Sequence, residues 1–338
     1  MEFGLALDFG TERATLDRVL DEYMPLLRLA ERQGFTSVWA GEAYPTGSGY
    51  FHLPSPLLVL AALAPRTRLG LGTGVTLLPM WPPLRLAYDA AVLDQLTGGR
   101  LVLGVGLGAP PTWARFGVPR EGLADRIDET LALLRALWSG ADGYHGQVVS
   151  VEGGIAPLPI QPGGPPLWVG GLVARAARRA ARYGDGWYAS SNYRFVDVER
   201  QAARYRAALA AEGKDPAAAV VSVNRLCFLA PTVEQARRQG GEYLERVLQR
   251  YAGYGGLLAP DGQTLRPGQA LLDVVADQHC LIGSPETVAA RLEDYARAGV
   301  THVQLRVAPG DMPAELVAQS ITLAGEQLLP RLAGAQRR

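Results

Sequence analysis

Short apolar runs alternate with amphipathic stretches along nearly the whole chain. The run Leu101 to Val105 is almost continuously hydrophobic, as expected of a strand that is buried on both faces. The stretch Leu84 to Leu96 has helical spacing and ends at the pair Gly98 and Gly99. Eight such strand–helix units in 338 residues predict an α/β fold, a closed (β/α)8 TIM barrel. A doubly wound open sheet is the alternative.

Two segments interrupt this alternation. Residues 141–165, after the fourth strand, are expected to form a small hairpin or excursion, and residues 251–280, after the seventh, an irregular insertion rich in Gly, Tyr and Pro. No linker or shift in composition divides the chain, so we expect a single domain over residues 1–338. The expected strands are 3–9, 37–40, 69–78, 101–105, 167–169, 187–189, 220–229 and 302–307.

Composition excludes several classes of protein. The formal net charge is zero, whereas a nucleic-acid binder usually carries a basic surplus. The four histidines show no ligand spacing, so no metal site is expected, and the two cysteines, Cys227 and Cys280, are too few for a disulfide scaffold. No apolar run reaches the ~18 residues of a membrane span, and the start lacks the basic region of a signal peptide. We therefore expect a cytoplasmic protein without nucleic-acid or membrane partners.

Catalytic residues of such barrels lie where the strands end, at the carboxyl face. Glycine is frequent there, and its missing Cβ lets a flat ligand or a phosphate approach the backbone. Gly170 and Gly171 end a strand just before a helix, which favours a phosphate site to which Arg175 would add charge, although an ordinary turn is equally compatible. The residues expected at this face are Asp8, Glu42, Thr73 to Thr76, Gly106 to Gly108, Gly170, Gly171, Ser190, Ser191, Arg225 and Arg306.

The segment Gly104 to Ala109 matches the glycine pattern of a dinucleotide-binding turn. It lies in the fourth unit rather than the first, and Pro110 and Pro111 follow where a helix should open, so we disfavour that interpretation. Close strand packing is the simpler alternative. Aromatic residues are frequent in the expected loops and suit an apolar pocket over a planar cofactor, although core or lid packing would also explain them. The candidate substrate or lid residues are Tyr50, Trp81, Trp113 and Tyr188.

Several motifs resemble one family, the bacterial luciferase-like monooxygenases. The stretch Leu69 to Pro79 resembles the third strand of that family, and Leu93 to Arg100 with Leu103 to Gly108 resembles its glycine-rich signature around the fourth. Further matches cover nearly the whole chain in order. They are residues 34–39, 128–138, 168–171, 181–187, 283–286 and 298–301.

The resemblance implies a barrel that binds FMN, or instead the 8-hydroxy-5-deazaflavin coenzyme F420, at the strand ends. It also implies that the peptide bond between Gly74 and Val75 is cis and forms a bulge supporting the ring. Gly106 and Gly108 would line the ring or ribityl side, and the 170–171 turn would hold the phosphate. The full set of expected cofactor-binding residues is Asp8, Thr73, Gly74, Val75, Gly106, Gly108, Gly170, Gly171 and Arg175.

Two positions depart from the family pattern. Many members carry an acidic residue followed by histidine after the second strand, whereas here Glu42 is followed by Ala43. Deazaflavin-dependent sugar-phosphate dehydrogenases also use a glutamate after the fourth strand, and Ala109 stands there in this chain. The catalytic residue is therefore not identified. Glu42 and His52 are the candidates, and Glu42 could equally be an ordinary loop carboxylate.

The leading hypothesis is a two-component monooxygenase. Reduced FMN from a separate flavin reductase would react with oxygen, and the protein would exclude water and place a small organic substrate. The alternatives are hydride transfer with coenzyme F420, a non-catalytic flavin-binding protein, and a barrel without flavin such as an isomerase. A homodimer is expected from the resemblance, and the apolar stretch Leu57 to Ala64 is compatible with it, although barrel packing would also explain that stretch.

Overall fold

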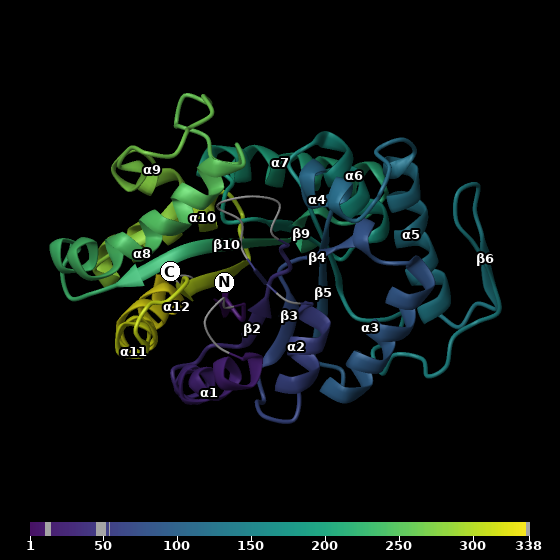
Figure 1. Cartoon of the computed structure of the whole chain (residues 1–338), viewed down its shortest axis with the longest axis horizontal. Helices are drawn as coiled ribbons and strands as arrows, with labels where there is room; N and C mark the ends of the chain where they lie inside the picture. Colours follow the sequence, from purple (N-terminus) through teal and green to yellow (C-terminus); the bar gives the residue numbers. More distant parts are fainter. Residues whose placement is uncertain (11–14, 45–51, 54, 336–338) are drawn as a thin grey trace.

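The chain folds into a parallel barrel surrounded by helices (Figure 1). This is seen in a computed structural model that describes residues 1–10, 15–44, 52–53 and 55–335. The strands follow the order β1, β2, β3, β5, β8, β9, β10 and β12, and β12 pairs with β1 in parallel to close the ring. The closing register sets Leu5 opposite Leu305. The predicted TIM barrel is therefore confirmed, and the open sheet is excluded.

The strands and helices have the following bounds. The strands are β1 (Glu2–Leu7), β2 (Ser37–Ala40), β3 (Gly70–Thr73), β4 (Thr76–Leu77), β5 (Leu101–Gly106), β6 (Gly143–His145), β7 (Ser150–Glu152), β8 (Leu167–Gly170), β9 (Gly186–Ala189), β10 (Val220–Leu229), β11 (Cys280–Gly283) and β12 (His302–Ala308). The α-helices are α1 (Leu16–Arg32), α2 (Pro56–Leu63), α3 (Pro83–Thr97), α4 (Pro110–Arg115), α5 (Leu123–Trp138), α6 (Ala174–Tyr183), α7 (Phe195–Ala211), α8 (Val233–Gly253), α9 (Leu271–His279), α10 (Pro285–Arg297), α11 (Ala314–Leu323) and α12 (Leu329–Ala335). Short 3-10 turns are Leu78–Met80 and Pro216–Ala218, and a π-turn, Ala324–Leu328, joins α11 to α12.

Local sequence signals account for many helix ends. Helix α10 begins after Ser284, whose hydroxyl accepts a hydrogen bond from the Thr287 N–H, and Pro285 occupies its first position. Helix α3 ends at Gly98 with φ +64°, a left-handed conformation that glycine adopts without a steric penalty. The apolar faces of the helices pack on the strands, and this layer forms the main core.

The third barrel strand is interrupted by a bulge. The peptide bond between Gly74 and Val75 is cis, as the family resemblance implies, and β3 and β4 on either side of it both pair with β5. The Gly74 N–H donates to the Ala40 carbonyl over 2.8 Å, and the Thr73 hydroxyl donates to the Gly104 carbonyl over 2.6 Å. The bulge is thus tied to the strands on both sides.

The two interruptions differ in kind. Within residues 141–165, β6 and β7 form the expected antiparallel hairpin, and the Glu129 carboxylate accepts backbone hydrogen bonds from Gln147, Val148 and Val149. Residues 251–280 are not irregular throughout, because α8 extends to Gly253 and α9 covers residues 271–279. Strand β11 follows and, among the described strands, pairs with the carboxyl-terminal part of β10 alone. A strand of four residues is too short to be recognised in the sequence by its hydrophobic periodicity.

Helix α4 is a second difference from the sequence analysis. It begins at Pro110 and Pro111, which the sequence analysis treats as evidence against a helix. The first N–H groups of a helix have no acceptor within it, so proline costs nothing at these positions. That argument against a helix is therefore wrong, although the turn still lies in the fourth unit rather than the first.

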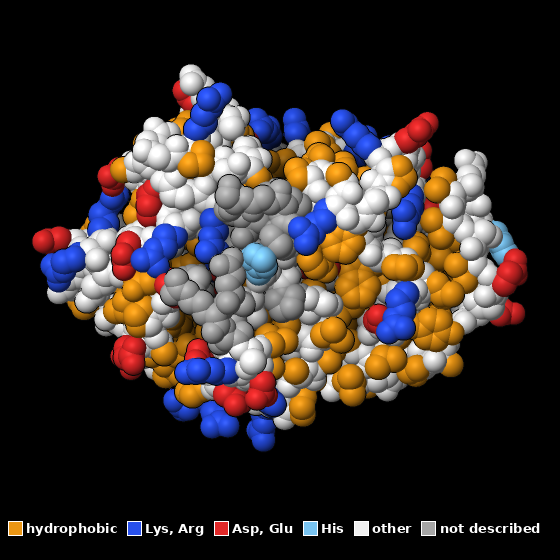
Figure 2. Space-filling view, in the orientation of Figure 1, with side chains coloured by type: hydrophobic (Ala, Val, Ile, Leu, Met, Phe, Trp, Pro, Cys, Tyr) orange, Lys and Arg blue, Asp and Glu red, His pale blue; other side chains and the backbone are white. Residues whose placement is uncertain are grey.

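The surface over α2 and α3 is rich in apolar side chains. Figure 2 shows orange side chains across the region where Figure 1 labels these two helices. A groove of about 580 Å³ lies between them, and the side chains of Leu58, Val92 and Leu96 on its walls are 72%, 40% and 58% exposed. Among the described helices, none has both the length and the apolar character needed to cross a bilayer.

Candidate functional site

A cavity of about 470 Å³ opens at the carboxyl ends of the barrel strands. Residues from all eight barrel strands, or from the loops that follow them, reach it, as expected for this fold. It contains most of the residues selected from the sequence. These are Asp8, Glu42, Gly74, Val75, Gly106, Gly108, Gly170, Gly171 and Tyr188.

Other predicted site residues lie outside this lining. The Thr73 side chain is buried beneath the bulge, and the Trp113 Nε1–H donates to the Leu107 carbonyl over 2.5 Å. Trp81 lies beside the second groove, and His52 is exposed and does not line the cavity. Tyr50 lies outside the described residues.

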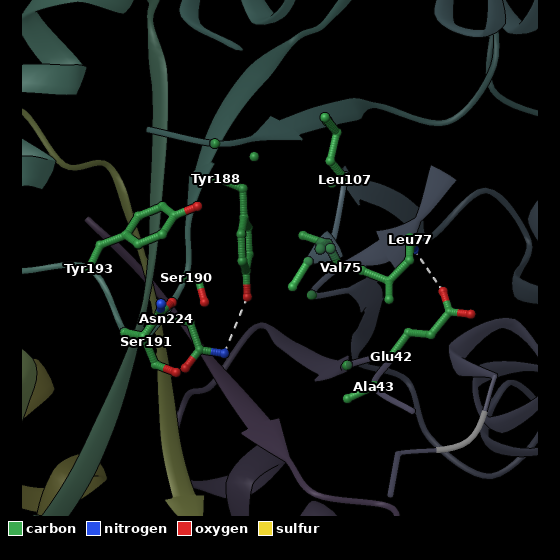
Figure 3. Close-up of a pocket in the computed structure, with 18 of the residues that line it drawn as sticks. Glu42, Ala43, Val75, Leu77, Leu107, Tyr188, Ser190, Ser191, Tyr193 and Asn224 are labelled. Atoms are coloured by element: carbon green, nitrogen blue, oxygen red, sulfur yellow. Dashed lines mark hydrogen bonds between the residues drawn. The ribbon is translucent and has the colours of Figure 1, made fainter. Parts of the chain in front are cut away.

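The cavity has an apolar wall and a polar wall (Figure 3). Val75, Leu77 and Leu107 form one side, and Tyr188, with serine and asparagine side chains around it, forms the other. The Asn224 Nδ2–H donates to the Tyr188 hydroxyl over 3.2 Å. Burial raises the pKa of Tyr188 well above its usual range, so the phenol stays neutral and protonated at physiological pH.

A buried ion pair closes the cavity beside β1 and β12. Asp8 accepts from the Arg306 guanidinium through both carboxylate oxygens, over 2.8 and 2.6 Å. Arg306 also donates to the Tyr251 hydroxyl, which is 2.5 Å from the Ser191 hydroxyl. Burial lowers the pKa of Arg306, but Asp8 and Tyr251 more than offset this and raise it overall. The Asp8 carboxylate is thus engaged by the protein itself.

The turn after β8 is built to bring backbone N–H groups to the cavity. Gly171 has φ +136°, and a Cβ there would lie 2.7 Å from the Ala176 side chain. The Gly171 carbonyl accepts from the Trp187 Nε1–H over 2.9 Å. In the described part of the chain, the N–H groups of Leu172 and Val173 donate to no acceptor, and both residues line the cavity at the start of α6. Such free N–H groups bind anions well.

The arginine at this turn is not the predicted one. Arg175 is absent from the lining and donates to Asp125 and Asp128 over 2.6 and 2.5 Å. Arg179, one helical turn further along α6, lines the cavity with a nearly buried side chain that also pairs with Asp128. The i to i+4 spacing places both arginines on one face of the helix, a signal the sequence analysis did not use.

Glu42 connects the end of β2 to the segment after the bulge. Its carboxylate accepts from the Leu77 N–H over 2.7 Å, from the Tyr44 hydroxyl over 2.5 Å and from the Trp81 Nε1–H over 3.3 Å. In Figure 3 the carboxylate points toward Leu77, whereas Ala43 lies beside the cavity. Burial raises the pKa of Glu42, although these hydrogen bonds oppose the increase. The geometry is that of a residue that positions Leu77.

Replacing Glu42 tests this role. Glu42→Leu leaves the buried Leu77 N–H without an acceptor and should lower the free energy of unfolding by about 1–3 kcal/mol, while Glu42→Gln keeps an acceptor oxygen and should cost less. The pKa of Glu42 is higher in the folded chain than its ordinary value of 4.5. The contribution of this carboxyl group to the free energy of unfolding is therefore greatest below pH 4.5, and it is lost as the pH rises through the pKa of the folded state. Urea unfolding at a series of pH values measures both effects. If the free energy of unfolding of Glu42→Gln depended on pH as steeply as that of the wild type, the role assigned to Glu42 would be wrong.

Comparison with known proteins identifies the family. The family model described as luciferase-like monooxygenase matches residues 1–302. The chain belongs to the luciferase-like monooxygenase family. The monooxygenase RslO1 from Streptomyces bottropensis has a solved structure that is 28% identical in sequence, with a TM-score of 0.82 over 98% of this chain and 99% of that one.

Curated relatives of this luciferase-like chain differ in cofactor. The oxygenase component of flavin-dependent trigonelline monooxygenase from Acinetobacter baylyi is 31% identical over 47% of this chain and 45% of its own length. The match thus spans less than half of that relative. The F420-dependent hydroxymycolic acid dehydrogenase of Mycobacterium tuberculosis is 32% identical over 63% of this chain and 59% of its own length. The chain is therefore a luciferase-like oxidoreductase of the flavin- or F420-dependent class.

The cavity of this luciferase-like enzyme fits a cofactor with a flat ring, a ribityl chain and a phosphate. A Cβ on Gly106 would lie 2.8 Å from the Val75 side chain, so only glycine there keeps the space beside the bulge open. The free N–H groups of Leu172 and Val173 provide the anion site at the other end. FMN and coenzyme F420 share this skeleton, and both classes of cofactor fit these features.

Proposed function

We propose that this chain is the oxygenase component of a two-component monooxygenase, which oxidises a small organic substrate with reduced FMN and O2. The observation that carries the proposal is the apolar lining around the expected ring position. Ala43 and Ala109 both line the cavity, so the positions at which the deazaflavin-dependent sugar-phosphate dehydrogenases carry their histidine and glutamate hold no proton-transfer group. Oxygen activation by reduced flavin needs exclusion of water more than it needs acids or bases.

Different residues of the cavity would bind the phosphate, support the ring, exclude water and contact the substrate. The N–H groups of Leu172 and Val173, with Arg179, would hold the phosphate, and Val75 would support one face of the ring. When bound, reduced FMN supplies the electrons that activate oxygen. The apolar side chains of Leu77 and Leu107 keep water away from the ring. The protonated Tyr188 hydroxyl presents a neutral polar group to the substrate side.

Hydride transfer with coenzyme F420 is the second candidate, because an F420-dependent dehydrogenase is among the relatives. The charge at the phosphate end favours FMN. Arg175 is held by Asp125 and Asp128 and does not line the cavity, so Arg179 is the one described arginine of α6 that faces the anion, which suits the single phosphate of FMN better than a longer anionic tail. A flavin-binding protein without activity is disfavoured, since the relatives of named activity with which the chain is compared are enzymes.

The expected partners follow from the same proposal. A separate flavin reductase would deliver reduced FMN, as two-component oxygenases require. A second copy of the chain would cover the apolar groove between α2 and α3, where Leu58 and Leu96 are exposed (Figure 2). We also propose a cytoplasmic location, because the two buried cysteines are free thiols, as is usual in a reducing compartment.

Equilibrium binding decides between the two cofactors. Purified protein is titrated with FMN and with coenzyme F420, each oxidised and reduced, and binding is followed by absorbance and fluorescence. We expect reduced FMN to bind at least about tenfold more tightly than reduced F420, a difference of about 1.4 kcal/mol. Preference for F420 would replace oxygen chemistry by hydride transfer, and binding of neither would refute the proposed function.

A further inference from the structure

A column of aromatic rings fills the axis of the barrel, where this fold usually packs branched aliphatic side chains. Tyr188 and Trp39 have ring centroids 5.7 Å apart. The Trp39 indole stacks on Trp168, with 4.9 Å between centroids and 23° between ring planes. Trp168 meets the His302 ring edge-on, again with 4.9 Å between centroids. The rings thus form an unbroken series of contacts.

The column runs from the cavity to the opposite mouth of the barrel. Tyr188 and Trp39 line the cavity, whereas Trp168 does not. His302 is the first residue of β12, so it lies at the amino-terminal end of the strands. Its side chain is 22% exposed, and its Nε2 lies 3.4 Å from the carboxylate of Glu2, which is 62% exposed. The far end of the column therefore reaches solvent.

Glycines on neighbouring strands make room for the indoles. A Cβ on Gly72 would lie 2.3 Å from the Trp39 ring, and one on Gly4 would lie 2.8 Å from its Nε1. A Cβ on Gly186 would lie 2.8 Å from the Trp168 ring. No side chain larger than hydrogen fits at these positions without moving an indole. The strand sequences thus specifically accommodate the two indole rings.

We propose that this column is a relay for one-electron oxidising equivalents, which it carries from the cavity to the amino-terminal mouth of the barrel. Indole and phenol rings are among the side chains most easily oxidised by one electron, and rings in contact exchange electrons readily. The use of the relay rests on the proposed function, because oxygen activation in the cavity is the source of the oxidants. Electron transfer along the rings does not itself need the cofactor.

The transfer balances without any new bond in the protein. An oxygen-derived radical in the cavity takes one electron from Trp39, and the Trp39 radical cation takes one from Trp168. The Trp39 Nε1–H keeps its proton, because its partner over 2.9 Å is the weakly basic hydroxyl of Ser37. A solvent reductant of the ascorbate or thiol class then reduces Trp168 and releases the proton that the reduced oxidant takes up. The protein returns to its starting state.

A photo-oxidant placed in the cavity tests the relay without flavin. Ala43→Cys introduces a thiol in the lining for a ruthenium polypyridyl label, while the native Cys227 and Cys280 are buried from the reagent. A laser flash with an external electron acceptor oxidises the label, and transient absorption records the tryptophan radical. We expect a tryptophan radical whose decay is accelerated by ascorbate in solution.

Substitutions in the labelled protein distinguish a relay from packing. Trp168→Phe keeps an aromatic ring but removes the easily oxidised indole, and should reduce the ascorbate-accelerated decay several-fold. Trp138→Phe is the matched control, because Trp138 is equally buried but packs against α3, where its Nε1–H donates to Ala87. Thermal unfolding checks that both variants are folded.

Either of two results would overturn the relay. One is a labelled parent protein without a tryptophan radical, and the other is equal behaviour of Trp168→Phe and Trp138→Phe. Because the ruthenium label replaces the cofactor as oxidant, the radical measurement does not depend on FMN binding. Failure of FMN to bind would refute the proposed function but would not affect this test of the relay.

Discussion

Gly171→Asp is expected to lower the affinity for FMN by at least about 100-fold, a loss of about 2.7 kcal/mol. The added carboxylate would stand at the start of α6, beside the free N–H groups of Leu172 and Val173. FMN brings a phosphate of charge about −1.5 to −2 to this place, and the two anions repel each other. The added Cβ would also lie 2.7 Å from the Ala176 side chain. In addition, Gly171 has φ +136°, which L-residues rarely adopt.

Two controls separate phosphate binding from damage to the fold. Gly213→Asp makes the same change at another left-handed glycine, with φ +71° and open space around it, and should leave FMN binding unchanged. Riboflavin, which lacks the phosphate, should bind Gly171→Asp as well as it binds the wild type. Fluorescence titration of the wild type and of both variants with each ligand measures these affinities. Undiminished FMN binding, or an equal loss of riboflavin binding, would show that the phosphate does not lie at this turn.

Asp8→Asn is expected to lower the free energy of unfolding by about 3–5 kcal/mol. The substitution leaves the Arg306 guanidinium, whose side chain is only 6% exposed, without the carboxylate that it contacts through two nitrogens. A buried charge without its counter-ion is far more costly than the net benefit of the pair. Urea unfolding measures the loss, and FMN titration at low urea shows whether the cavity survives.

An exposed ion pair provides the matched control. Asp21 lies 3.3 Å from Arg66, with side chains 68% and 39% exposed, so Asp21→Asn should cost less than about 1 kcal/mol. The double variant Asp8→Leu with Arg306→Met removes both charges and should recover much of the stability. If Asp8→Asn is no more harmful than Asp21→Asn, the buried pair does not hold β1 to β12.

The sequence was informative wherever the signal is local. Alternating apolar runs predicted the barrel, and the run Leu101 to Val105 lies within β5. The family motifs indicated the bulge at Gly74 and Val75, and glycines such as Gly106 lie in the cavity as expected. Glycine at a strand end allows close approach of a ligand or of a neighbouring strand, and its position in the sequence is directly visible.

Contacts between residues that are far apart in the sequence were harder to predict. The sequence analysis selected Arg175, whereas the structure places Arg179 at the cavity, because the acidic residues of α5 hold Arg175 away from it. Asp8 is at the cavity as expected, but Arg306, which is 298 positions away along the chain, occupies both of its oxygens. Neither pairing has a local sequence signature.

The amino-acid sequence alone predicts the eight barrel strands and their order, because strand burial and helix amphipathicity are periodic properties of neighbouring residues, but it does not reveal β11 or the helices α4 and α9. Which side chains come into contact depends on the tertiary structure. Trp39, Trp168 and His302 come from three different strands, and they share the barrel axis only because the stagger of the closed sheet brings them together. That stagger is set by hydrogen bonds around the whole ring, and no short stretch of sequence contains it.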